Sequence, residues 1–385
     1  MTHYKMSDVA VEVNDRENNP ASSKYDRFVG LEHYVSGEVI IRNYGSTENL
    51  ESTMKIFQSG DVLVARRNVY LKRASMVDFD GLTSGDSIVL RAKNPVIGRI
   101  LPFVLNTDAF WDFADQYSDG TMSKRLSPKT LMTYEFDLPD EEELEKFADL
   151  LWAANDTRES YQALLRQTDE LVKSQFIELF GDPKENTLGW KMVKLKECLQ
   201  RIDSGKSIVC ESHPRSGDFP AILKLSAVTY GEFIPEENKQ LPSKELYIPS
   251  LEVKTGDLLF SRKNTLEYVG MTVLVKETPV NLMLPDLIFR LVPNETITPL
   301  YLHQLINHPQ FRSTISNLAS GSAGSMPNIS KQKLFDLEIP LPPLGMQKSL
   351  CPLIQQTDKS KFEIKKAIEN TSALIKSLMQ QDLTN

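Results

Sequence analysis

Two short basic loops hold the side chains in this sequence best suited to binding a ligand. Each loop follows a Gly-Asp pair and a run of apolar residues, and the side chains are Arg66, Arg67 and Asn68 in the first loop, and Arg262, Lys263 and Asn264 in the second. Arginine can form paired hydrogen bonds with guanine edges or phosphate, and asparagine can do so with adenine. A solvated loop explains any one of these residues equally well. The recurrence of the whole pattern favours a DNA-binding role.

Six further residues complete the set that we expect to contact DNA. Two of them lie just beyond the first basic loop, and two lie in the Gly-rich segment 320–325, which we interpret as a flexible loop without dinucleotide-binding spacing. The six residues are Lys72, Arg73, Lys206, Lys224, Ser322 and Ser325.

The usual signatures of catalysis and of metal binding are missing. Ser204–Ser207 resembles the end of a phosphate-binding loop, but Gln200 stands where that loop requires glycine. His303 and His308 are five residues apart with no glutamate beside the first, which is not the metalloprotease pattern. We therefore expect no catalytic residue, cofactor site or metal site in this chain. An enzyme with an unrecognised site stays as a minor alternative.

An internal repeat indicates how the two loops are positioned. Residues 60–68 match residues 256–264, and residues 86–90 match residues 286–290. Phe110 with Gly120 likewise matches Phe311 with Gly321. From residues 4–6, which match 190–192, to residues 165–174, which match 368–377, the displacement drifts from 186 to 203, as small loop insertions would produce. Each half is thus expected to be a mixed domain followed by a helix. In the second half we predict strands at 221–228, 257–261, 271–275 and 287–291, and helices at 300–307 and 310–318.

Two long helices are predicted, over 141–180 and 346–383. Apolar residues recur in both at spacings of three and four, which is one face of a helix. A helix of about 60 Å needs a partner of similar length to cover its apolar stripe. We therefore expect the two helices to pair, although two unrelated helices, each packed on its own domain, are the alternative. The Pro-rich segment 341–344 is expected to be a stiff elbow before the second helix.

Composition sets the remaining limits. The chain has 385 residues, 41% of them apolar, which is enough for two domains with a core in each. No apolar run reaches the length of a membrane span and the start of the chain is too polar for a signal peptide, so we expect a cytoplasmic protein. Cys198, Cys210 and Cys351 lie far apart, and neither a disulfide framework nor a zinc site is indicated. The net charge of −8 does not exclude nucleic acid, because local basic clusters can still face phosphate.

Over nearly its whole length the chain resembles the specificity (S) subunits of type I restriction-modification systems. The repeat and its basic loops carry the resemblance, together with Pro327–Ser330, the segment Ile339–Leu344 and the segment Lys173–Pro183. Two features depart from the family pattern. Met346-Gln347 stands where the family usually has Glu-Gln, and the first half lacks the Pro-Pro elbow.

The resemblance implies an α+β fold in which two similar mixed α/β target-recognition domains are joined by two long antiparallel helices that form a coiled-coil spacer. The expected parts are recognition domain 1 at 1–139, the central helix at 140–181, recognition domain 2 at 182–344 and the C-terminal helix at 345–385.

The resemblance also implies a non-catalytic subunit whose two domains each read one half of a bipartite target in double-stranded DNA. The helices are expected to dock methyltransferase subunits, which carry S-adenosylmethionine, and a restriction or translocase subunit is a further expected partner. A scaffold of a phage-defence complex that does not read DNA is the alternative, motivated by the acidic balance and the altered first elbow.

Overall fold

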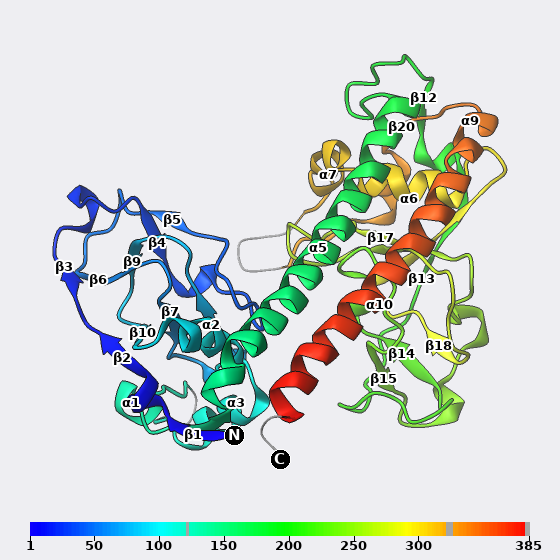
Figure 1. Ribbon diagram of the computed structural model, residues 1–385. Coiled ribbons are helices and arrows are strands. Elements are labelled where there is room, and N and C mark those ends of the chain that lie inside the picture. The colour runs from blue at the N-terminus through cyan, green and yellow to red at the C-terminus, as the bar shows by residue number, and fades with distance from the viewer. Residues whose placement is uncertain (121–122, 321–325, 382–385) are drawn as a thin grey trace. The chain divides into compact units, whose positions relative to one another are not determined.

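The computed structural model describes residues 1–120, 123–320 and 326–381 (Figure 1). The chain forms two compact units. Unit 1 consists of Met1–Leu164 with Glu363–Asn385, and unit 2 consists of Leu165–Phe362. Both units mix helices and strands.

Unit 1 is built on an antiparallel four-stranded sheet in the order β2 (Ala10–Val13), β10 (Ser87–Ala92), β7 (Val62–Ala65) and β8 (Ala74–Met76). A second sheet has the order β3 (Arg16–Glu17), β6 (Met54–Phe57), β9 (Gly81–Thr83), β4 (Arg27–Val29) and β5 (Gly45–Ser46), with β4 and β9 parallel. β1 (Thr2–Lys5) pairs with β11 (Glu135–Leu138). The short helices are α1 (Met6–Val9), α2 (Pro95–Val104), α3 (Asp108–Gln116) and α4 (Pro128–Leu131).

Unit 2 has a corresponding antiparallel sheet in the order β13 (Leu199–Ser204), β19 (Ile288–Pro293), β16 (Leu258–Ser261) and β17 (Thr272–Leu274). A three-stranded sheet has the order β15 (Asn238–Gln240), β14 (Ala221–Leu223) and β18 (Leu282–Met283), with β14 and β18 parallel. β12 (Met192–Lys194) pairs with β20 (Glu338–Pro340). The short helices are α6 (Pro299–Asn307), α7 (Pro309–Ser316) and α8 (Lys331–Phe335).

The strand orders bear out the repeat, because each strand of the sheet in unit 1 has its counterpart at the same place in unit 2. Before the central strands, Gly60 and Gly256 adopt nearly the same left-handed φ, 90° and 92°, a conformation that favours glycine. The strand register corrects one part of the sequence match. Val62 pairs with Leu90 and Leu258 pairs with Leu291, so the counterpart of Leu90 is Leu291 and not Arg290.

Most of the elements predicted for the second half are confirmed, including β16, β17, β19, α6 and α7. The strand predicted over 221–228 is wrong in its second part. β14 ends at Leu223, and Leu225–Val228 forms a 3-10 helix. The amide of Lys224 bonds the carbonyl of Glu237, and the amide of Ala227 then turns back to the carbonyl of Lys224. The apolar run extends through this turn because Ala227 and Val228 are buried in the core, so apolar character alone did not mark the end of the strand.

The long helix α5 (Glu141–Phe180) has the predicted bounds. The second long helix begins later than predicted. α9 (Leu344–Ser349) ends before α10 (Cys351–Gln381), and Pro352 occupies the first turn of α10, where its missing N–H costs no hydrogen bond. The final predicted residues, 382 and 383, lie outside the described part of the chain.

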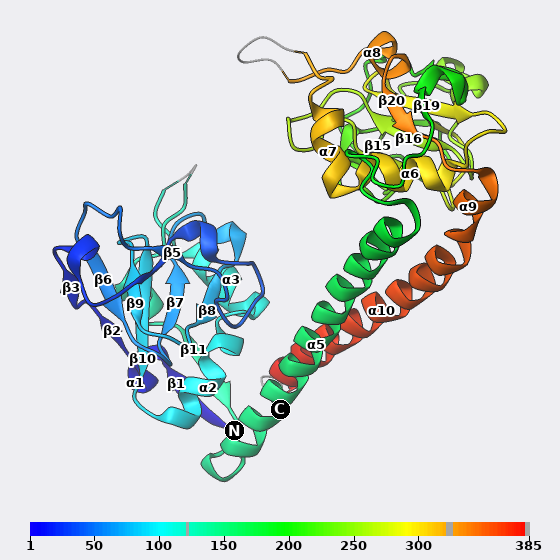
Figure 2. The same ribbon diagram turned by 90° about the horizontal axis from the view of Figure 1, so that it is seen from above.

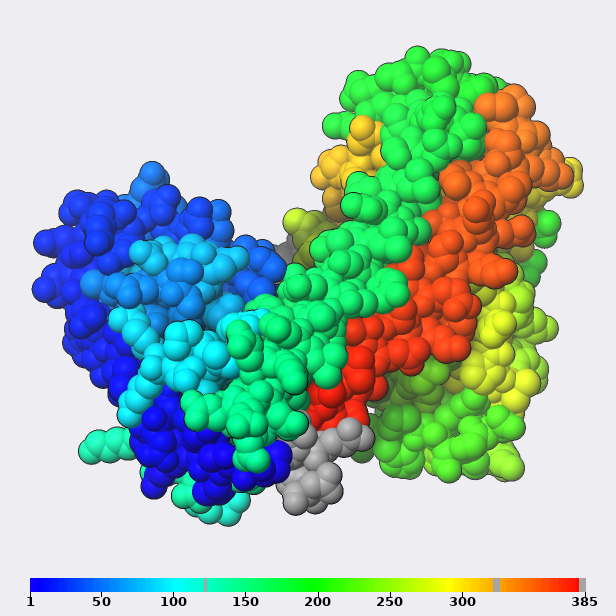
Figure 3. Space-filling model, viewed as in Figure 1, coloured from blue at the N-terminus to red at the C-terminus, as the bar shows by residue number. Residues whose placement is uncertain are grey.

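The two long helices share a hydrophobic core in each unit. In unit 1, Met379 of α10 belongs with Leu151 of α5 to one buried cluster, and the partly buried Ile375 packs against it. In unit 2, Ile354 belongs with Val172 and Phe176 to another. Figures 2 and 3 show α10 alongside α5 in both units. Among the described residues, none of the helices is both long and apolar enough to cross a membrane.

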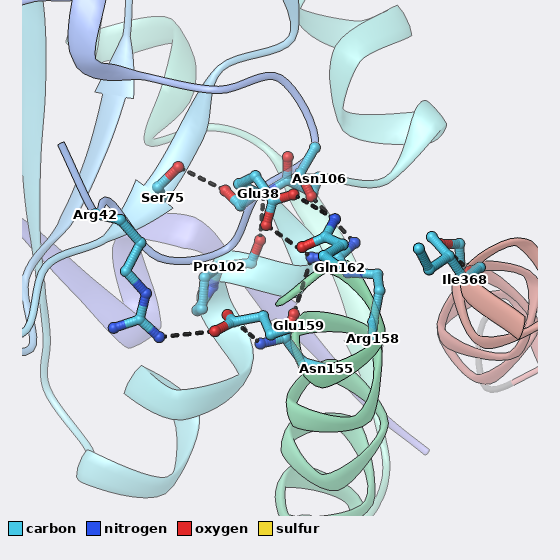
Figure 4. A network of polar contacts seen from close by, with 12 residues as sticks. Glu38, Arg42, Ser75, Pro102, Asn106, Asn155, Arg158, Glu159, Gln162 and Ile368 are labelled. Carbon is cyan, nitrogen blue, oxygen red and sulfur yellow. Dashed lines mark hydrogen bonds and ion pairs between the residues drawn. The ribbon is translucent and has the colours of Figure 1, made fainter. Parts of the chain in front are cut away.

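A polar network fixes α5 to the folded part of unit 1 (Figure 4). The carboxylate of Glu38 accepts hydrogen bonds from Arg158 at 3.2 Å and from Gln162 at 3.0 Å. Arg42 forms an ion pair with Glu159 at 2.8 Å, one turn away from Gln162. Because Glu38 and Arg42 of one loop bind these three α5 residues, they hold the unit 1 part of the helix against the sheets of unit 1.

Candidate nucleic-acid interface

The first basic loop begins where β7 ends, and its backbone is held from both sides. The amide of Arg66 donates to the carbonyl of Asp86 at 2.9 Å, and the amide of Leu126 donates to the carbonyl of Arg66 at 2.8 Å. The segment after β7 therefore lies between the turn that precedes β10 and the segment that precedes α4. Arg67 and Arg125 face each other across an antiparallel bridge in this segment.

Three arginines gather around one carboxylate at this place. Asp86 forms ion pairs with Arg67, at 3.4 Å, and with Arg125. The side chains of Arg67 and Arg125 are about half exposed, at 52% and 47%. Arg66 lies behind them and donates from Nε to the carbonyl of Leu126 at 3.2 Å. Burial, followed by the nearby charge of Arg125, lowers the pKa of Arg66. The cluster is rigid, positive and open to solvent on the side of Arg67 and Arg125, which suits a phosphate or a base edge.

The other expected residues of the first loop support this cluster. Asn68 has a left-handed φ of 56°, and its side-chain oxygen accepts a hydrogen bond from Ser123 at 2.9 Å. Arg73 donates to the carbonyls of Leu31 and Arg67, at 2.9 and 3.2 Å. Arg73 therefore braces the backbone that carries Arg67. Among the first-half candidates the structure thus brings Arg66, Arg67, Asn68 and Arg73 together.

Lys72 does not join the cluster through its side chain. Its ammonium forms an ion pair with Asp108 of α3 at 3.0 Å, and Asp108 also pairs with Lys376 of α10 at 2.6 Å. The hydrogen bond from Lys376, followed by the one from Lys72, lowers the pKa of Asp108. In this structure the charge of Lys72 is directed to α3 and α10.

The second basic loop repeats the backbone arrangement of the first. The amide of Arg262 donates to the carbonyl of Leu287 at 3.1 Å, and the amide of Ile329 donates to the carbonyl of Arg262 at 2.8 Å. The Arg262 guanidinium donates from Nε to Asn328 Oδ1 at 3.1 Å and lies 4.9 Å from the centre of the Phe289 ring. Stacking on an aromatic ring fixes the plane of the guanidinium.

Lys263 and Asn264 have different environments. Lys263 is half-buried, and its backbone forms a bridge with Asn328. Asn264 is only 6% exposed, and its amide nitrogen donates to Thr229 Oγ1 at 3.1 Å and to Ser261 Oγ at 3.3 Å. Both of its N–H groups are committed inside the unit. The expectation that this amide faces an adenine is therefore corrected, and Asn264 holds the end of β16.

Lys206 and Lys224 lie at the smaller sheet of unit 2. The exposed Lys206 follows β13, and its amide donates to the carbonyl of Leu284 at 3.3 Å. Lys224 follows β14 and forms an ion pair with Glu237 at 3.5 Å. Neither contact brings these lysines to the Arg262 cluster. The last two candidates, Ser322 and Ser325, lie outside the described residues.

Arg125 and Asn328 complete the two clusters, and neither was predicted to contact DNA, although Asn328 lies in the motif Pro327–Ser330 that carries the family resemblance. Each residue closes a short hairpin, because Arg125 bridges Asp119 and Asn328 bridges Ser320. The matched pairs of Phe110 with Gly120 and of Phe311 with Gly321 marked these hairpins in the sequence. The step from that match to the basic loops needs the fold, since about 60 residues separate each hairpin from its loop. Among the described residues no group of His, Cys, Asp and Glu side chains is arranged to hold a metal ion.

Comparison with known proteins points to one family. Residues 187–371 match the family described as the type I restriction modification DNA specificity domain. The chain is 30% identical over 190 residues to the type I restriction enzyme EcoEI specificity subunit of Escherichia coli, a match that covers 49% of this chain and 32% of the relative. It is 22% identical over 306 residues to the EcoKI specificity subunit of Escherichia coli strain K12, with 77% and 66% covered. The chain thus spans about a third and about two thirds of the lengths of these two relatives.

Solved structures share the fold over the whole chain. One belongs to a study of complex assembly and conformational transition of the type I R-M system, with a TM-score of 0.53, 19% identity and coverage of 99% of this chain and 97% of the other. The S subunit from M. genitalium has a TM-score of 0.55 at 12% identity, with 100% and 96% covered. The named relatives are specificity subunits, in agreement with the expected non-catalytic role. By these matches the chain is similar to the specificity subunits of type I restriction enzymes, and its residues 187–371 match the type I restriction modification DNA specificity domain family.

Proposed function

We propose that this chain is the DNA specificity subunit of a type I restriction-modification complex, and that each unit reads one half of a bipartite target. The observation that carries the proposal is the repeated basic cluster. At equivalent strand ends, Arg66 and Arg262 are held by the same pair of backbone hydrogen bonds. A rigid donor in each unit is what recognition of two half-sites requires, because a fixed side chain loses little entropy when it binds a base edge.

The long helices have a separate task in this proposal. α5 and α10 pair as an antiparallel coiled coil, and this spacer fixes the gap between the two half-sites. The shared apolar clusters in both units support the pairing. At about 1.5 Å per residue, the 40 residues of α5 measure about 60 Å. That length accommodates two readers set at least about one turn of duplex apart.

In this proposal the catalysed reactions take place in partner subunits. We infer that the helices dock methyltransferase subunits, that S-adenosylmethionine binds in those subunits, and that a restriction or translocase subunit joins the same complex. The domain boundaries 139/140, 181/182 and 344/345 belong to this proposal as well.

Methylation mapping tests the proposal. The chain and its methyltransferase are expressed together in a host without adenine methylation, and the modified sites are sequenced. One bipartite motif with an invariant gap is expected. Methylation without sequence preference, or no methylation while the complex assembles, would contradict DNA reading and favour a scaffold.

A second measurement separates the contribution of the basic clusters to DNA binding from that of surface charge in general. Arg67→Ala in unit 1 and Arg262→Ala in unit 2 are expected to weaken binding of target DNA by the complex, with a shallower dependence of affinity on salt if a phosphate contact is lost. The matched controls are Arg16→Ala and Lys239→Ala, which remove exposed charges from β3 in the five-stranded sheet of unit 1 and from β15 in the three-stranded sheet of unit 2. Equal losses in the variants and the controls would mean that the clusters have no special role.

A further inference from the structure

The two basic clusters are equivalent in backbone but differ in their side chains, including the side chains at two positions that form an ion pair in unit 1. The bridge between Arg67 and Arg125 corresponds to the bridge between Lys263 and Asn328. The carbonyl that accepts from the first arginine of each loop belongs to Asp86 in unit 1 and to Leu287 in unit 2. Arg125 and Asn328 therefore occupy one structural position, and Asp86 and Leu287 occupy another.

In unit 1 the two changes occur together. Where unit 2 has the amide of Asn328, unit 1 has the guanidinium of Arg125. Where unit 2 has the apolar Leu287, unit 1 has the carboxylate of Asp86. The carboxylate binds that guanidinium through Oδ1 and Arg67 through Oδ2. An arginine has five N–H donors, so an ion pair at one edge leaves others for a ligand. Asp86 is 24% exposed, whereas Arg125 is 47% exposed, so the anchor lies inward and the guanidinium lies toward solvent.

The chemistry of the two positions differs accordingly. A guanidinium that is anchored on one side keeps a planar pair of donors that matches O6 and N7 of guanine. In unit 2, Asn328 Oδ1 already accepts from Arg262, which orients the amide so that its two N–H groups point away from Arg262. A donor-only amide of this kind contacts single acceptors and lacks the paired geometry of the guanidinium.

We propose that Arg125 is a specificity-determining residue that reads a guanine in the half-site of unit 1, and that Asp86 is the positioning residue which holds it for that contact. This inference rests on the proposed function. Asp86 does not touch DNA. It acts by keeping the Arg125 guanidinium in one orientation, so the effect of Asp86 passes through Arg125.

The test uses the full chain in its complex with the methyltransferase, and methylated sites are sequenced for each variant. Arg125→Ala and Arg125→Lys are expected to relax one guanine position in one half of the motif, with discrimination there reduced about 10-fold to 100-fold. Asp86→Asn is expected to relax the same position to a smaller extent. The double variant is expected to behave like Arg125→Ala alone, because residues that act as a unit are not additive.

Several results separate a specific role from a structural one. Asn328→Ala is the matched variant in unit 2. It is expected to leave unchanged the guanine position in the half-site that unit 1 reads. Thermal unfolding identifies any variant that merely loses its fold, and Arg125→Lys, which keeps the charge, remains informative in that case. An unchanged motif in a folded Arg125→Ala complex would overturn the inference, and so would a uniform loss of affinity for all sequences. If the wild-type complex itself gave no bipartite motif, the proposed function would fail instead.

Discussion

The carboxylate of Asp61 accepts two hydrogen bonds from Arg91, from Nε at 2.8 Å and from Nη2 at 2.7 Å. Its counterpart in unit 2, Asp257, forms an ion pair with Arg290 at 2.9 Å. The two arginines are not at equivalent positions. Arg91 follows Leu90, which pairs with Val62 of β7, whereas Arg290 precedes Leu291, which pairs with Leu258 of β16. In both units an arginine of the neighbouring strand thus holds the aspartate of the Gly-Asp turn, but the arginine comes from a different position in that strand. An ion pair therefore holds the turn that precedes the central strand and its basic loop in each unit.

Loss of this anchor is expected to destabilise unit 1. The Asp61 side chain is 2% exposed, whereas Arg91 is 36% exposed, so water partly compensates the arginine when its partner is removed. Asp61→Ala is expected to lower the free energy of unfolding by about 2 kcal/mol. Hydrogen exchange at the amides of β7 and β10 measures the change. Asp78→Ala, which breaks an exposed ion pair with Arg42, is the control and should cost well under 1 kcal/mol. Equal effects of the two variants would contradict the anchoring role.

Adjacent residues of the second loop are expected to separate stability from DNA binding. Asn264→Ala removes two buried hydrogen bonds and should destabilise unit 2 by about 1–3 kcal/mol while the methylation motif stays the same. Lys263→Ala should do the opposite, with little change in unfolding and weaker binding of DNA. Thermal unfolding and a binding titration at fixed salt measure both variants side by side. A changed motif in Asn264→Ala would show that this residue reads DNA after all.

The stability of unit 2 is expected to depend on pH through a half-buried histidine. His303 lies in α6 and contacts Thr272 at 3.1 Å, and burial lowers its pKa from 6.5 to about 4. In the window between these two values the unfolded chain takes up a proton that the folded unit does not. Stability is therefore full above about pH 6.5 and falls as the pH decreases toward 4.

The expected loss between pH 7 and pH 5 is about 2 kcal/mol. Hydrogen exchange at the amides of α6 measures it without requiring the whole chain to unfold in one step. His303→Gln should flatten this dependence, whereas the control His213→Gln, at an exposed position, should leave it unchanged. Because burial also lowers the pKa of His308, a smaller slope is expected to remain in His303→Gln. A slope unaffected by the His303 change would contradict this assignment.

Regular spacing in the sequence predicted the long helix α5 to the residue, since its apolar face and its Gly181-Asp182-Pro183 end are local features. The repeat likewise predicted the central strands. Burial was not predictable in the same way. Asn264 has the same residue type as Asn68, yet its amide is turned inward because Thr229, 35 residues earlier in the chain, offers a hydroxyl to it. Arg125 escaped notice for a similar reason, because only the fold brings its hairpin to the loop after β7.

Modular reading of the target gives the last prediction. Residues 1–137 contain the whole first basic cluster and end just before α5, so they can be exchanged for the corresponding segment of another specificity subunit without altering either long helix. If each unit reads its own half-site, the exchange should change one half of the methylation motif and leave the other half and the gap intact. The gap is expected to stay because the exchanged chain keeps the residues of α5 and α10 that share the apolar clusters. Methylome sequencing of cells with the hybrid chain measures all three features at once. A change in both halves would mean that the units do not read independently, and a change in the gap alone would mean that residues 1–137 help to set the spacing.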